Sequence, residues 1–125
     1  MRGLTAFAAP VLALHVMAAP ASAEQAPRPL SGRYALDLPA CRAGDNFLTL
    51  GPDRLDLPVF SCQGLTFTPE TAAGDRVLWS VSARRCEGEE GAPGPRRFRI
   101  EASGATLRIL WPDGTKSAPL RRCGR

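Results

Sequence analysis

The chain has 125 residues, and 16 basic against 12 acidic residues give it a net charge of +4 at pH 7. This mild excess, which is nearly all arginine, argues for neither nucleic-acid binding nor membrane binding. The only histidine is His15. If the first 23 residues are removed, no histidine is left for a Ser-His-Asp triad, a Cys-His pair or a histidine-bearing zinc site. We therefore expect a protein that is not an enzyme, with no cofactor and no nucleic-acid partner.

Residues 1–23 have the features of a secretory signal peptide. Arg2 provides a charged start, residues 4–17 form an apolar run, and Ala21-Ser22-Ala23 matches the small-residue pattern of a cleavage site. The apolar run is shorter than the ~20 residues that a membrane span needs. We expect cleavage after Ala23, a periplasmic or secreted location, and no stable membrane insertion after cleavage.

The remaining chain, about 100 residues, is the length of one domain. Residues 24–30 are polar and rich in proline, which predicts a flexible N-terminal arm. Residues 31–125 then form a single β domain.

Four cysteines, an even number, follow the signal peptide: Cys41, Cys62, Cys86 and Cys123. In an exported chain this predicts two disulfides. Their long spacings differ from the C-x-x-C pairs of structural zinc sites and redox-active thiols. Three connectivities are possible. We favour Cys41–Cys62 with Cys86–Cys123, because each bridge then cross-links one half of the chain.

Apolar residues alternate with a period of two along most of the domain, which is typical of half-buried strands. The clearest strand spans residues 76–85, where Val77, Trp79, Val81 and Ala83 share one face. Shorter alternations occur at residues 34–38, 48–50, 55–59, 65–67, 98–102, 107–111 and 118–120. The pattern predicts an all-β fold: a small antiparallel meander of seven or eight strands, closed or partly closed into a barrel and cross-linked by disulfides. A two-sheet sandwich is the alternative.

Two turn signals separate the last strands. Pro112-Asp113-Gly114-Thr115 is typical of a type I turn with a bulge. If Ser103 and Gly104 are the two loop residues of the hairpin before it, Phe98 faces Ile109 on the inner side. The expected register is therefore one that pairs these two apolar residues.

The same register places two arginines, Arg99 and Arg108, directly opposite each other on the outer face. Like charges so placed are destabilising unless an anion lies between them. We interpret Arg99, Arg108, Arg97 and Lys116 as an anion-contacting face. The alternative is a solvated outer face in an arginine-rich protein.

Three aromatic residues, Tyr34, Trp79 and Trp111, have the inward parity of their strands. They predict either core packing or a small apolar pocket in the mouth of a barrel. The glutamates Glu87, Glu89 and Glu90 lie in a glycine-bearing loop but lack the ordered ligand positions of a calcium loop. We therefore expect no metal site.

The pattern from Gly32-x-Tyr34 through Cys41 and Cys62 to Arg122-Cys123 resembles small exported four-cysteine proteins of proteobacteria. That resemblance spans most of residues 31–123 and implies a periplasmic β domain, with no particular activity. The stretch from Gly32 to Cys62 is also similar to periplasmic metalloprotease inhibitors, which are small β-barrels with an N-terminal arm. The second cysteine pair departs from the inhibitor pattern.

Together these features predict an exported, non-catalytic β domain that is a binding module, with an envelope protein or an anionic polymer as its partner. One alternative is a periplasmic inhibitor of a protease or other hydrolase. A second is a structural component of the envelope. An enzyme working with carboxylates, Ser/Thr or arginine alone is the rival class.

Overall fold

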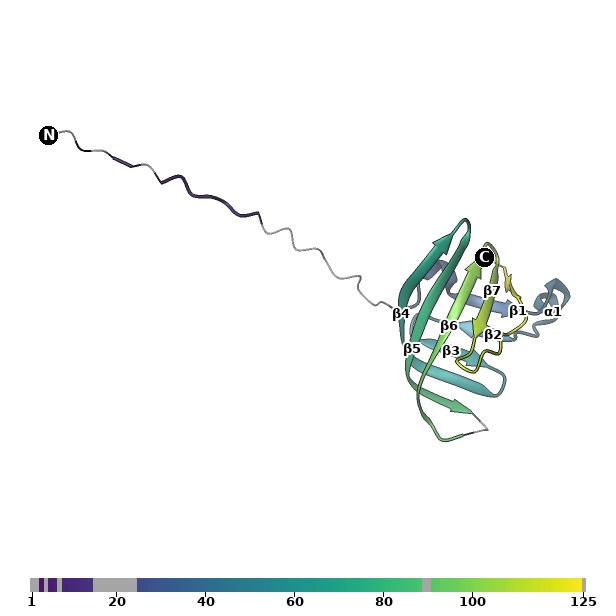
Figure 1. Cartoon of the computed structure of the whole chain (residues 1–125). Coiled ribbons are helices and arrows are strands. Elements are labelled where there is room, and N and C mark those ends of the chain that lie inside the picture. The colour runs from purple at the N-terminus through teal and green to yellow at the C-terminus, as the bar shows by residue number, and fades with distance from the viewer. Residues whose placement is uncertain (1–2, 4, 7, 15–24, 89–90, 125) are drawn as a thin grey trace.

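The computed structural model describes residues 3, 5, 6, 8–14, 25–88 and 91–124. Eight antiparallel strands close into one barrel in chain order, and β1 pairs with both β2 and β8 (Figure 1). The strands are β1 (Gly32–Ala35), β2 (Leu48–Leu50), β3 (Arg54–Leu57), β4 (Phe60–Ala73), β5 (Arg76–Gly88), β6 (Gly94–Ser103), β7 (Thr106–Leu110) and β8 (Leu120–Cys123). Two short helices, η1 (Arg28–Leu30) and α1 (Leu38–Ala43), accompany them. The predicted all-β barrel is confirmed, and the sandwich alternative is wrong.

The core fills the barrel interior with side chains of inward parity. On β5, Val81 and Ala83 are buried while Arg84 is exposed, so the predicted alternation of this strand is confirmed there. Phe67 on β4 is also fully buried, and its ring meets Trp79 edge-on at 6.1 Å between centroids. Among the described residues no polar or charged side chain is buried in this core. Burial of this apolar set is the main favourable term of folding.

The expected strand at residues 34–38 ends early, before Leu36. The side chains of Leu36 and Leu38 are 57% and 43% exposed, so neither has the inward position that the alternation predicted. Asp37 diverts the chain, because its carboxylate accepts a hydrogen bond from the backbone N–H of Ala40 at 2.8 Å and caps α1. Gly44 ends that helix in the left-handed conformation at φ 77°.

The expected strand at residues 55–59 is also shorter, because Pro58 and Val59 form a hairpin loop. Leu57 pairs with Phe60 across this loop, and Val59 is 61% exposed. Proline has no backbone N–H for a strand ladder, so the chain turns there rather than extending β3.

The register between β6 and β7 differs from the expected one by two residues. Ser103 pairs with Thr106, so the loop is Gly104-Ala105, and Gly104 takes the positive φ of 57° at the first loop position. Ile100 therefore faces Ile109. A shift of two keeps every side chain on its predicted face, whereas a shift of one would have exchanged the faces.

The turn predicted at residues 112–115 is confirmed. The backbone N–H of Gly114 donates to the Trp111 carbonyl at 3.0 Å, and Trp111 N–H donates to the Thr115 carbonyl at 2.8 Å. Gly114 has φ 90°, a conformation that glycine adopts without strain. This tight hairpin directs the chain away from β7 directly after Trp111.

The disulfides are Cys41–Cys123 and Cys62–Cys86, so the favoured pairing is wrong. Cys62 and Cys86 are directly opposed on β4 and β5, with Cα atoms 4.0 Å apart. Cys41 lies on α1 and Cys123 on β8, with Cα atoms 5.2 Å apart. Closure of the barrel brings the last strand beside the first, and a rule based on nearness in sequence misses that contact.

The described part of the expected arm contacts the barrel. Ala26 is buried, and the hydroxyl of Tyr34 donates to the carbonyl of Leu30 at 2.8 Å. The Arg122 guanidinium donates to the carbonyl of Ser31 at 2.8 Å and lies over the Tyr34 ring, 5.6 Å from its centroid. Tyr34 and Arg122 thus join this segment to β1 and β8.

Tyr34 is the only tyrosine in the chain, so its ionisation can be followed directly by ultraviolet absorbance. Burial raises its pKa above the ordinary value of about 10, and the nearby Arg122 guanidinium opposes this without reversing it. The stability that neutral Tyr34 contributes is fully present below pH ~10 and is lost as pH rises through the higher folded pKa. We expect the absorbance step at a higher pH in the folded protein than in denaturant, and no step in Tyr34→Phe. Coincident titrations would contradict the burial.

Candidate functional site

Trp111 follows β7 and packs against the core with a partly buried side chain. Its ring lies 5.8 Å from the Phe60 ring and 5.5 Å from the Phe98 ring, between centroids. The sequence pattern predicts that the inward aromatic residues either pack in the core or line a pocket. Buried Tyr34 fits core packing, whereas Trp111 both packs on the core and lines two surface pockets. Trp111 is therefore the residue around which the candidate site is built.

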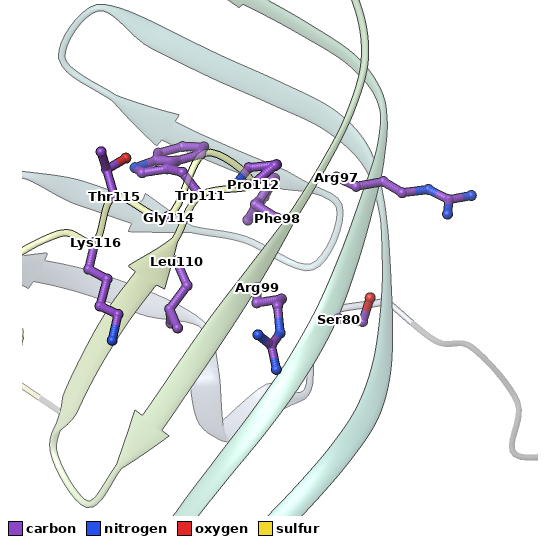
Figure 2. Close-up of a pocket in the computed structure, with 10 residues that line it drawn as sticks. All are labelled: Ser80, Arg97, Phe98, Arg99, Leu110, Trp111, Pro112, Gly114, Thr115 and Lys116. Atoms are coloured by element: carbon purple, nitrogen blue, oxygen red, sulfur yellow. The ribbon is translucent and has the colours of Figure 1, made fainter.

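The first pocket, of about 530 Å³, contains three of the four cations of the predicted anion-contacting face: Arg97, Arg99 and Lys116. They come together because strand pairing aligns residues of β5, β6, β7 and the segment after the hairpin. Ser80 pairs with Arg99, Arg99 with Leu110, and Leu110 with Lys116. Figure 2 shows the side chains of Arg99 and Lys116 on the same side of the sheet, with Arg97 pointing in a different direction.

The three cations differ in their partners. Arg99 Nε donates to the carboxylate of Glu70 on β4 at 2.9 Å, and this exposed pair offsets its charge. Such exposed pairs add little to stability, about 0–1 kcal/mol. Neither Arg97 nor Lys116 forms an ion pair or a side-chain hydrogen bond with any residue in the described part of the chain. These two side chains leave the first pocket with uncompensated positive charge.

The fourth predicted cation, Arg108, is not part of this pocket. It faces Glu101 across β6 and β7, and Leu110 takes the place opposite Arg99 that Arg108 was expected to occupy. The two-residue change in register is the cause. Arg108 lines a separate pocket with Arg76.

The second pocket, of about 620 Å³, lies against Trp111 and is mainly apolar, with Leu57, Val59, Phe60 and Pro112 in its wall. Val59 is held in an exposed position by the hairpin turn between β3 and β4. The sequence pattern offered Trp111 as a residue of an apolar pocket, but it did not reveal the wall formed by Leu57, Val59 and Phe60. Pro58 followed by Val59 could have indicated a turn. The period-two alternation instead assigned both residues to a strand.

Asp113 shapes the hairpin that carries the wall shared by the two pockets. Its carboxylate accepts hydrogen bonds from the backbone N–H and the hydroxyl of Thr115, at 2.9 and 2.6 Å. These bonds hold the pKa of Asp113 below its ordinary value. Asp113 is therefore an anion whose Oδ1 atom is held by Thr115, and it adds a negative charge to the wall of the second pocket.

No group of His, Cys, Asp and Glu in the described part of the chain is placed to hold a metal ion. Glu89, Glu90 and His15 lie outside the described residues, as does the expected cleavage site. Neither helix among the described residues has the length and apolar character needed to span a membrane. Comparison with known proteins finds no matching family model, curated protein or solved structure.

Proposed function

We propose that this chain is an exported, non-catalytic binding module that holds a partner against the Trp111 end of its barrel. One observation carries the proposal: Trp111 lines both a pocket with Arg97 and Lys116, cations without an ion-pair partner among the described residues, and an apolar pocket containing Val59. The two disulfides support an oxidising location, periplasmic or secreted.

The arrangement favours a protein partner over a purely charged polymer. A polyanion would use the cations and leave the apolar pocket empty. A protein segment with an apolar side chain beside acidic residues would fill both pockets. Tryptophan and arginine side chains next to small apolar pockets are enriched among residues that dominate protein interfaces. Charges at the rim mainly increase the rate of encounter and select the partner.

If the partner is a protease or other hydrolase, the chain is a periplasmic inhibitor. If the partner is a resident envelope protein, the chain is a structural component of the envelope. Both cases use the same surface in this proposal. Identification of the partner separates them.

Heparin is a suitable probe for the charged half of the site. We expect Arg97→Gln with Lys116→Gln to weaken heparin binding about fivefold at low salt, since exposed charge pairs contribute about 0.2–1 kcal/mol each. The matched control is Arg33→Gln with Arg42→Gln, which removes the same charge from exposed positions outside both pockets. Titration by calorimetry measures the difference. Equal losses in the two double variants would show that net charge alone binds heparin and would contradict a local site.

A further inference from the structure

Arg108 lies partly buried on β7, and none of its side-chain donors forms a hydrogen bond within the described part of the chain. Its Nε atom is buried and has no hydrogen-bond partner among the described residues. Glu101 faces it across the β6–β7 ladder, yet the two form no ion pair within that part of the chain. A buried donor without a partner is costly, and a bound ion can supply the missing acceptor.

A second guanidinium reaches the same place. Arg76 on β5 pairs with Ser103 on β6, and it lines a pocket of about 190 Å³ together with Arg108, Glu101 and Thr106. Arg76 and Arg108 stand two strands apart and two residues out of line along β6, about 12 Å by ordinary strand geometry. Long arginine side chains span that distance over β6. Both residues line the same pocket, Arg76 from β5 and Arg108 from β7.

The neighbouring polar groups leave the guanidiniums as the free donors of this pocket. The Ser103 hydroxyl donates to the carboxylate of Asp75 at 3.3 Å, and the Thr106 hydroxyl donates to the Ser103 carbonyl at 2.8 Å. Glu101 contributes one negative charge to the pocket wall against two positive charges. The lining residues alone therefore have a net charge of +1, and the Asp75 carboxylate lies beside them on Ser103.

We infer that Arg76 and Arg108 form a binding site for a phosphate-type oxyanion. Guanidinium groups recognise phosphate and carboxylate through paired N–H donors. A phosphate group offers more acceptor oxygens and more negative charge than a carboxylate, and so is better suited to accept from two guanidiniums at once. The pocket volume suits a single phosphate group. This site shares no residue with the two Trp111 pockets and does not depend on the proposed function.

The test follows the arginine Nε–H resonances of the isotope-labelled protein during titration with inorganic phosphate at constant ionic strength. We expect the Arg108 and Arg76 resonances to shift saturably, with smaller shifts for acetate and none for chloride. Arg108→Gln is expected to weaken phosphate binding about tenfold, read from the amides of Ser103 and Thr106. Arg42→Gln, the matched control at an exposed position outside all three pockets, leaves the affinity unchanged. Glu101→Gln is expected to tighten binding, because it removes the only acidic side chain in the pocket wall.

Equal shifts with chloride, or unchanged phosphate affinity in Arg108→Gln, would overturn the inference. A third outcome would also overturn it: Glu101→Gln shifts the Arg108 resonance, while phosphate does not shift it in the wild type. Glu101 would then be the partner of Arg108 in solution. Sedimentation with phosphatidylglycerol vesicles, compared with phosphatidylcholine vesicles, identifies the source. Sedimentation that Arg108→Gln abolishes supports a lipid headgroup, and phosphate binding without sedimentation supports a free phosphate compound.

Discussion

Replacing Cys41 and Cys123 together by alanine is expected to lower the free energy of unfolding by about 4.5 kcal/mol. The two residues are 82 positions apart, and the chain entropy that a disulfide removes from the unfolded state grows with the length of the closed loop. The Cys62–Cys86 bridge closes a loop of 24 residues, for which the same relation gives about 3.5 kcal/mol. A domain of this size has a total stability of about 5–15 kcal/mol. Loss of the longer bridge therefore removes a large share of it.

The position of this bridge adds a second reason for a large effect. Cys123 ends β8, and it pairs with Arg33 of β1 where the barrel closes. On its other side β8 pairs with β7 at only two positions, Thr106 with Arg121 and Leu107 with Leu120. Without Cys41–Cys123, α1 loses its covalent link to β8, and the closure between β1 and β8 depends on a few ladder bonds and on Arg122.

Chemical denaturation of the wild type and of both cysteine-pair variants measures these effects. The expected order of stability is wild type, then the variant lacking Cys62–Cys86, then the variant lacking Cys41–Cys123. In the variant lacking Cys41–Cys123, amide hydrogen exchange is expected to increase first in β1 and β8. Equal stability of the two variants, or the reverse order, would contradict the role assigned to barrel closure.

The parts of the fold that depend on local pattern were predictable. The alternation of residues 76–85 predicted β5, and the Pro112–Thr115 sequence predicted the hairpin, because each signal is complete within a few residues. Helix α1 was missed because six residues are fewer than two helical turns and show no period. Its only signals are Asp37 as a cap and a proline in its first turn.

Long-range features were beyond the sequence pattern. The disulfide pairing depends on closure between β1 and β8, which no local signal specifies. The β6–β7 register depends on which residue of Ser103-Gly104-Ala105 opens the loop, and two choices preserve the inward faces equally well. This choice separated Arg108 from Arg99 and so divided the predicted anion-contacting face between two pockets.

The binding proposal has its most direct test in affinity capture from the envelope fraction of the host. Four baits are compared: the wild type, Val59→Asp, the Arg97→Gln, Lys116→Gln double variant, and the Arg33→Gln, Arg42→Gln control. Val59 is 61% exposed, so aspartate there changes the apolar pocket at little cost to folding. Each bait is washed at low and then at high salt, because salt screens exposed charges and leaves apolar contacts in place.

We predict one protein retained by the wild type and by the control through both washes, lost from Val59→Asp, and reduced with the Arg97→Gln, Lys116→Gln bait at low salt. If the retained protein is a hydrolase, the chain is identified as an inhibitor. Material that the salt wash removes from every bait would indicate an anionic polymer and contradict the protein partner. Equal retention by all four baits, or no retention by the wild type, would contradict a binding site at Trp111.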